Sequence, residues 1–186
     1  MVMLAIDKRS DLSKGATKRM RQSGSIPAVL YGKGADAQSI SVDQAAFEAV
    51  LRKTADGHLS TTRFTLESGG EKVEAIVKGI QYHVTTYNII HLDFEKLTEN
   101  EVITVKVPLR YEGAAECVGI KLGGVLRQVI RAVTVCCKPK DMPSEFVLNV
   151  QKLGVKQSKR VRDIAVGEGV RVISKPDEVV VVIAKR

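Results

Sequence analysis

Short stretches of alternating apolar and polar residues run through most of this 186-residue chain, and they constrain its fold more than any other feature. The clearest is Val102–Tyr111, whose apolar residues on one face are Ile103, Val105, Val107 and Leu109. A period of two is typical of a strand with one buried side, because successive side chains point to opposite faces. The sequence therefore predicts a mainly β protein with a few short helices.

A polar segment separates the alternating stretches into two groups. Residues 95–101 are polar apart from one leucine, and they interrupt the apolar pattern. Breaks of this kind are typical of connections between structural units. We therefore predict two domains, residues 1–97 and 98–186, and expect the second to be all-β.

The first half is predicted to combine strands with two helices. A helix at Lys14–Gln22 has Ser13 as its N-cap, and a second helix begins after Asp43. The helical spacing of the second predicts four core-facing residues, namely Phe47, Val50, Leu51 and Thr54. The expected strands are Met3–Arg9, Ile26–Gly32, Gln38–Val42, Thr61–Glu67, Glu71–Ile80 and Asn88–Phe94.

The second half is predicted to contain further strands and no helix longer than a turn or two. After Val102–Tyr111, the segment Gly113–Gly124 is interpreted as a surface loop. The remaining expected strands are Val125–Lys138, Glu145–Val150, Val161–Val166, Val170–Ser174 and Glu178–Ala184.

Positive charge is concentrated near the N-terminus. The whole chain has a net charge of +8, and residues 8–33 hold seven of its basic side chains against the single acid Asp11. On a helical wheel Lys14, Thr17, Lys18 and Arg21 share one sector of the predicted helix, whereas Arg19 falls outside it. Such a local patch is expected of a phosphate-binding surface, although a solvated charged face is the alternative.

A second basic cluster lies in the other half of the chain. It comprises Lys152, Lys156, Lys159, Arg160 and Arg162, with no acidic residue among them. Because these residues are spread over a longer segment, we rank this cluster below the first as a binding surface.

The sequence gives little support for catalysis, a metal site or a cofactor. The three histidines lack a recognisable ligand spacing, and neither a phosphate-binding loop nor a nucleophile elbow occurs. No apolar run approaches the roughly 20 residues of a membrane helix. Three cysteines without a Cys-x-x-Cys motif, and no evident export signal, favour a reduced, cytoplasmic protein. We expect no enzyme and no small-molecule substrate.

One expected strand carries polar side chains of interest. In Asn88–Phe94 the alternation places Ile90, Leu92 and Phe94 on one face, and His91 and Asp93 on the other. A carboxylate can accept hydrogen bonds from base amines or a 2′-hydroxyl, so Asp93 would add specificity on an RNA-facing sheet. A surface His–Asp contact without a ligand is the open alternative.

These residues, taken in order, resemble a known family. The segments Lys14–Arg21 and Gly24–Gly32, together with Arg9, are similar to the signature of the bacterial large-subunit ribosomal protein twenty-five family. Gln81-x-His83 and residues 91–94 resemble its second signature. Gly113, residues 119–126 and Asp141–Pro143 resemble the longer, two-domain Ctc or general stress protein form.

The resemblance implies a fold, a partner and a set of contact residues. It implies an N-terminal small β-barrel with helices that binds 5S rRNA around loop E, and an all-β C-terminal domain, both at the central protuberance of the large subunit. The implied RNA-binding residues are Arg9, Lys14, Thr17, Lys18, Arg19, Arg21, Tyr31, His91 and Asp93. Tyr82 and Val84 depart from the residues that often flank the His83 position in the family.

Two other readings stay open from the sequence. One is an RNA-recognition domain that acts in trans with a tRNA synthetase, on the analogy of the barrel in the anticodon-binding region of glutaminyl-tRNA synthetases. The other is a protein-interaction module that uses β-edges of the C-terminal half.

Overall fold

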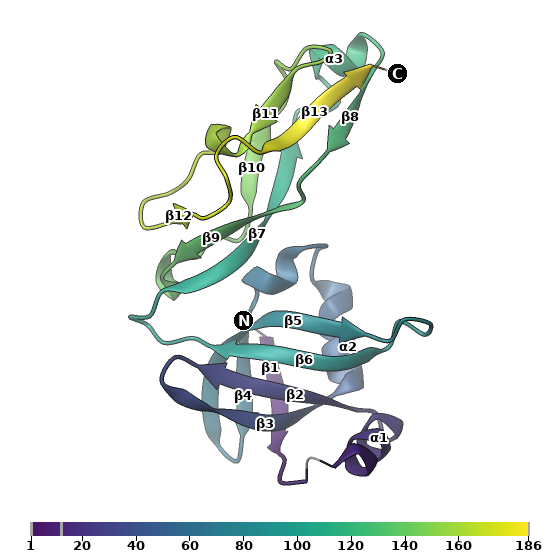
Figure 1. The fold of residues 1–186 in the computed structure, drawn as a ribbon, viewed down its shortest axis with the longest axis vertical. Coiled ribbons are helices and arrows are strands. Elements are labelled where there is room, and N and C mark those ends of the chain that lie inside the picture. Colours follow the sequence, from purple (N-terminus) through teal and green to yellow (C-terminus); the bar gives the residue numbers. More distant parts are fainter. Residues whose placement is uncertain (1, 12, 186) are drawn as a thin grey trace. The chain divides into compact units, whose positions relative to one another are not determined.

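The chain forms two compact units, residues 1–101 and 102–186 (Figure 1). The computed structural model describes residues 2–11 and 13–185. Strands dominate both units and the helices among the described residues are short, which confirms the predicted mainly β class. The boundary predicted after Leu97 lies in the segment that joins the last strand of the first unit to the first strand of the second.

The first unit is a closed β-barrel with the strand order β1-β3-β2-β6-β5-β4. Its strands are β1 (Val2–Lys8), β2 (Ser25–Gly32), β3 (Ala35–Asp43), β4 (Arg63–Ser68), β5 (Glu71–Tyr82) and β6 (Ile89–Lys96). Neighbouring strands are antiparallel except for two parallel pairs, β1 with β4 and β2 with β6. The β1–β4 pair closes the barrel, so neither strand is left as an unpaired edge.

The helices of the first unit begin where the sequence predicts. Helix α1 (Lys14–Gln22) starts after Ser13, whose Oγ accepts a hydrogen bond from the Ala16 amide at 3.2 Å. Helix α2 (Gln44–Lys53) starts after Asp43, whose carboxylate accepts from the Ala46 amide at 2.8 Å. These bonds satisfy amides that have no partner inside the helix. A short 3-10 helix, η1 (His58–Thr61), follows α2.

Aromatic rings fill the barrel core and fix α2 to it. Phe47 of α2 stacks on Phe64 of β4 with ring centroids 6.3 Å apart, and Phe64 meets Phe94 of β6 edge to face at 6.1 Å. All three side chains are fully buried. Val50 and Leu51 are partly buried against the same core, as the helical spacing predicts.

The alternation predicted for β6 holds along most of the strand and fails at its start. Leu92 and Phe94 are fully buried, but Ile89 rather than Ile90 joins the core. The register between β5 and β6 shifts between Gln81 and Tyr82, and this bulge adds one residue to one strand. Ile90 is therefore only half-buried.

The second unit is built from two small sheets, ordered β10-β7-β9-β12 and β11-β13-β8. The strands are β7 (Ile103–Glu112), β8 (Gly124–Gln128), β9 (Ala132–Cys137), β10 (Phe146–Asn149), β11 (Ser158–Arg160), β12 (Arg171–Val172) and β13 (Val179–Lys185). Helix α3 (Val118–Lys121) and two 3-10 helices, η2 (Pro139–Asp141) and η3 (Val161–Asp163), connect them. Valines of β7, β9 and β13 form much of its core.

Two predictions for this unit were wrong for a related reason. The single strand expected at Val125–Lys138 is two strands, because β8 pairs with β13 whereas β9 pairs with β7. The expected strand Val161–Val166 does not form: residues Val161–Asp163 are the 3-10 helix η3, and Val161 and Ile164 are buried at a spacing of three. Short apolar patterns do not show where a chain changes sheets or makes one helical turn.

The segment Gly113–Gly124 is more ordered than the predicted surface loop. It contains α3, and Cys117, Gly119 and Gly124 are buried. A Cβ added at Gly119 would lie 2.8 Å from Ile183 and 2.9 Å from the Gly154 backbone. A glycine is therefore required here because two backbone segments approach closely.

Candidate nucleic-acid interface

Helix α1 presents its cations to solvent. None of its side chains is fully buried, and Lys14, Lys18, Arg19 and Arg21 are all exposed. The loop before the helix is held by Asp11, whose Oδ1 accepts from the Ser13 amide at 2.9 Å. Hydrogen bonds from Ser13 lower the pKa of Asp11, and the charges of Arg19 and Arg9 lower it further.

Arg9 connects the end of β1 to this helix. Its Nη2 donates to Thr17 Oγ1 at 3.2 Å, and that hydroxyl donates in turn to the Ser13 carbonyl at 3.0 Å. Its Nε is buried and has no hydrogen-bond partner among the residues that the structure describes. A buried donor without a partner is costly, so this N–H group lowers the stability of the loop rather than serving a ligand.

Arg21 joins the same helix to strand β6. Its Nε donates to the Ile90 carbonyl at 3.2 Å, across 69 positions of sequence. Because His91 follows Ile90 directly, this bond places the C-terminal end of α1 beside the polar face of β6. The Arg21–Ile90 bond thus links the cationic helix to the His–Asp strand. We refer to the predicted RNA-binding residues as the α1–β6 surface; they are Arg9, Lys14, Thr17, Lys18, Arg19, Arg21, Tyr31, His91 and Asp93.

His91 and Asp93 lie side by side on the outer face of the barrel. Nδ1 of His91 is 3.0 Å from Oδ1 of Asp93, and the two side chains are 24% and 37% exposed. The pair is not aligned as a hydrogen bond, since Nδ1 has no bonding partner of acceptable geometry among the described residues. Asp93 therefore keeps lone pairs available for a ligand donor.

Gly79 of β5 makes room for this carboxylate. Gly79 faces Asp93 across the β5–β6 ladder, and a Cβ added there would lie 2.9 Å from Oδ2 of Asp93. Any larger residue would push the carboxylate from its place. The sequence analysis missed Gly79, although a glycine inside an expected strand is itself a signal of close approach.

Tyr31 borders the pair on strand β2. In the parallel β2–β6 ladder Val29 lies opposite Asp93, and Tyr31 lies opposite Glu95. Burial raises the pKa of Tyr31, and the carboxylates of Glu95 and Asp93 raise it further. The phenol is therefore protonated at neutral pH and can donate a hydrogen bond. Glu95 itself forms an ion pair with Lys78 of β5, with Nζ and Oε2 2.7 Å apart.

The structure places the predicted residues in two groups. Six of them make or border the contacts described above, namely Arg9, Thr17, Arg21, Tyr31, His91 and Asp93. Lys14, Lys18 and Arg19 extend from α1 without an ion pair to any residue that the structure describes. The charge of Arg19 lowers the pKa of Asp11.

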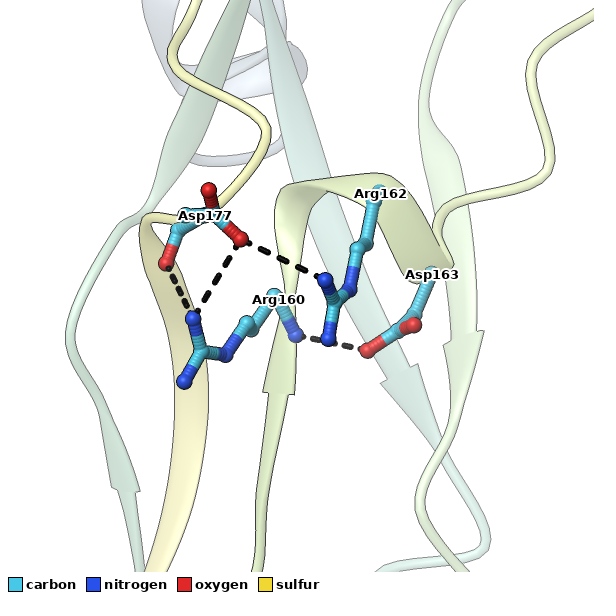
Figure 2. A network of polar contacts seen from close by, with 4 residues as sticks. All are labelled: Arg160, Arg162, Asp163 and Asp177. Atoms are coloured by element: carbon cyan, nitrogen blue, oxygen red, sulfur yellow. Dashed lines mark hydrogen bonds and ion pairs between the residues drawn. The ribbon is translucent and has the colours of Figure 1, made fainter.

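The second basic cluster is organised differently (Figure 2). Nη1 of Arg160 and Nη1 of Arg162 lie 3.4 Å and 3.3 Å from the same Oδ1 of Asp177. The Arg160 amide donates to Asp163 at 2.8 Å and caps η3. One acid distant in sequence, Asp177, thus reduces the positive potential at Arg160 and Arg162.

Residues 2–11 and 13–185 contain neither a cluster of metal ligands nor a membrane-spanning helix. No three histidine, cysteine, aspartate or glutamate side chains in these ranges cluster as metal ligands would. No helix in these ranges is long and apolar enough to cross a membrane.

Comparison with known proteins agrees with the division into two units. A model of the ribosomal L25p family matches residues 4–94, and a model of the ribosomal protein TL5 C-terminal domain matches residues 102–186. Large ribosomal subunit protein bL25 of Chlamydia trachomatis serovar A is 45% identical over 98% of this chain and 99% of its own length. The proteins of the same name from Chlamydia muridarum and Chlamydia pneumoniae are 43% and 42% identical over the same shares. The chain therefore belongs to the ribosomal L25p family, in its two-domain form with a TL5-type C-terminal domain.

Proposed function

We propose that this chain is a structural constituent of the large ribosomal subunit, that it binds 5S rRNA around loop E through the α1–β6 surface, and that it lies at the central protuberance. Membership of a family of structural ribosomal proteins supports a ribosomal role and argues against an enzyme. The hydrogen bond from Arg21 to Ile90 carries the assignment of the surface, because it joins the cationic helix to the polar strand face.

Phosphate contacts supply the affinity in this proposal. Lys14, Lys18 and Arg19 are exposed and lie on one short helix, so several phosphates of one RNA strand are within their reach. Each neutralised phosphate releases counterions, which makes binding fall steeply as salt rises.

The strand face supplies discrimination. Asp93 accepts from base amines or 2′-hydroxyls, while Tyr31 donates through its protonated phenol. A carboxylate on a basic surface repels phosphates unless it meets a donor, so Asp93 favours RNAs that present one there. Loop E, an irregular region of 5S rRNA, is the target that the family resemblance implies. A ribosome-bound protein of this kind would work in the cytoplasm.

Binding of the purified full-length chain to 5S rRNA across a salt series tests this function. We expect tight binding that survives excess tRNA and an unrelated RNA hairpin. Lys14→Ala should weaken binding and reduce the salt slope by about one unit at most. Asp93→Ala should instead reduce the preference for 5S rRNA over the two competitors.

Two outcomes would contradict the proposal. Equal binding to all three RNAs, lost at moderate salt, would indicate generic electrostatic attraction. An unchanged salt slope in single alanine variants of Lys14, Lys18 and Arg21 would show that the helix is not the phosphate-binding element. Association with a tRNA synthetase in place of ribosomes would favour a role in trans.

A further inference from the structure

The hairpin between β5 and β6 exposes aromatic side chains that the α1–β6 surface does not use. The chain has four tyrosines and no tryptophan, and two of the tyrosines, Tyr82 and Tyr87, lie in this hairpin. Tyr87 is 77% exposed, Tyr82 is 49% exposed, and Val84 between them is 90% exposed. The low aromatic content of the chain argues against a stacking platform, but the fold gathers two of the few rings at one place.

The hairpin is held in one conformation by its own backbone and one imidazole. Nδ1 of His83 accepts from the amides of Thr85 and Thr86 at 3.3 and 3.2 Å. The His83 amide donates to the Asn88 carbonyl at 2.8 Å, and the Tyr87 amide donates to the His83 carbonyl at 2.9 Å. The rings are thus carried on an ordered turn, and little ordering remains to be done on binding.

Tyr87 has a strained backbone. Its φ is +57°, in the left-handed region that glycine and asparagine adopt readily and a bulky residue seldom does. Residues held in such conformations cluster at active sites and ligand-binding sites. An exposed ring held at such a position points to a contact outside the chain.

The position and charge of the hairpin favour an RNA ligand. The hairpin leads directly into Ile89 and Ile90, and the Ile90 carbonyl is the acceptor of the bond from Arg21. Between Lys78 and Asp93 the sequence has no acidic residue, so nothing on the hairpin repels a phosphate backbone. Figure 1 shows the hairpin reaching past the ends of the neighbouring barrel strands.

We propose that Tyr82 and Tyr87 form a stacking platform for unpaired nucleotides of the RNA that the α1–β6 surface binds. This inference rests on the proposed function. Tyrosine rings stack on any base and leave the sequence preference to other groups. With this platform, the protein would contact an adjoining single-stranded or irregular RNA segment in addition to the grooves of an RNA helix.

Variants of the full chain with transcribed 5S rRNA as the probe test the platform. Tyr87→Asn removes the ring and keeps a residue that tolerates the left-handed backbone, and it should weaken binding about tenfold. Because tyrosine is neutral, the salt slope should not change. Tyr87→Phe keeps the ring, and Val84→Ala shortens an apolar side chain that is even more exposed, so both should bind as the wild type does.

Chemical probing of the RNA bases gives an independent readout. Nucleotides that the wild-type chain protects should become reactive with Tyr87→Asn and Tyr82→Ala and stay protected with Val84→Ala. Unchanged thermal unfolding would show that each variant is folded.

The possible results distinguish a failure of the stacking platform from a failure of the proposed 5S rRNA binding. If the wild type prefers 5S rRNA over tRNA and Tyr87→Asn matches it, the platform is overturned and the function stands. The platform is also overturned if Tyr87→Asn binds RNA normally but enters ribosomal particles poorly, because the ring would then contact protein. If the wild type shows no preference for 5S rRNA, both proposals fall.

Discussion

The cations of α1 and the arginines beside η3 carry the same charge in different surroundings. Lys14 and Lys18 meet no ion-pair partner in the part of the chain that the structure describes, whereas Arg160 and Arg162 share the carboxylate of Asp177 (Figure 2). In sequence both segments are basic runs with few or no acids. The difference comes from a residue at least 15 positions away. The density of basic residues in the sequence therefore identifies candidate binding surfaces. The fold then determines in which of them the cations are free of ion pairs and available to a phosphate.

The same comparison explains why the two clusters should differ in binding. Exposed ion pairs such as those at Asp177 add about 0–1 kcal/mol to stability. They still matter for an anionic ligand, because a phosphate that approaches Arg160 or Arg162 must compete with a carboxylate already present. At Lys14 and Lys18 a phosphate displaces only water and counterions.

Matched charge reversal is expected to give the largest effect. Replacing Lys14, Lys18 and Arg21 with glutamate should weaken 5S rRNA binding by more than about a hundredfold at physiological salt, because attraction becomes repulsion. Replacing Lys152, Lys156 and Lys159 with glutamate changes the net charge equally and should alter binding only slightly. Filter binding of both triple variants of the full chain measures the difference. Similar losses in the two variants would mean that net charge, not the α1–β6 surface, determines binding.

Gly79→Ala should have the next largest effect. The new Cβ would lie 2.9 Å from Asp93 Oδ2, so the carboxylate must move away from its place beside His91. We expect little change in stability, because the carboxylate belongs to a partly exposed side chain that can rotate away, but a reduced preference for 5S rRNA over tRNA. Gly167→Ala, where nothing lies within 4 Å of the added Cβ, is the control. Retained discrimination in Gly79→Ala would remove Asp93 from the set of discriminating residues.

The features that the sequence predicted well are local ones. The bounds of α1 and the caps Ser13 and Asp43 follow from residues within one helical turn, and the structure confirms them. The bond from Arg21 to Ile90 spans 69 positions, and the closeness of Gly79 to Asp93 depends on a ladder register with two shifts. No local pattern encodes either. The family resemblance implied the closed barrel, whereas the alternation of apolar and polar residues did not.

Asp177→Ala should have a smaller effect that tests the contrast between the clusters directly. Removing this carboxylate frees both arginines, so weak binding to any RNA should rise about two- to threefold at low salt. The preference for 5S rRNA over tRNA should not change, and stability should fall by less than about 1 kcal/mol. Competition binding and thermal unfolding measure these effects. A gain in specific 5S rRNA affinity would show that the second cluster reads the same RNA.

The smallest expected effect concerns the titration of Tyr31. Burial and then the charges of Glu95 and Asp93 raise the pKa of this phenol above its usual value near 10. A raised pKa means that the folded protein keeps the proton while the unfolded chain loses it. The associated stability is therefore complete below about pH 10 and is lost as the pH rises through the folded pKa.

Asp93→Asn removes one of these negative charges and should lower the pKa of Tyr31. The shift should be partial, because burial is the largest cause and stays in place. The absorbance of phenolate in an alkaline titration measures this pKa shift. The variant Tyr31→Phe shows which part of the titration curve belongs to Tyr31. Tyr111, whose pKa burial also raises, is an internal control in the second unit and should titrate as before. An unchanged Tyr31 step would mean that the two side chains do not share the electrostatic environment on which the proposed RNA contact depends.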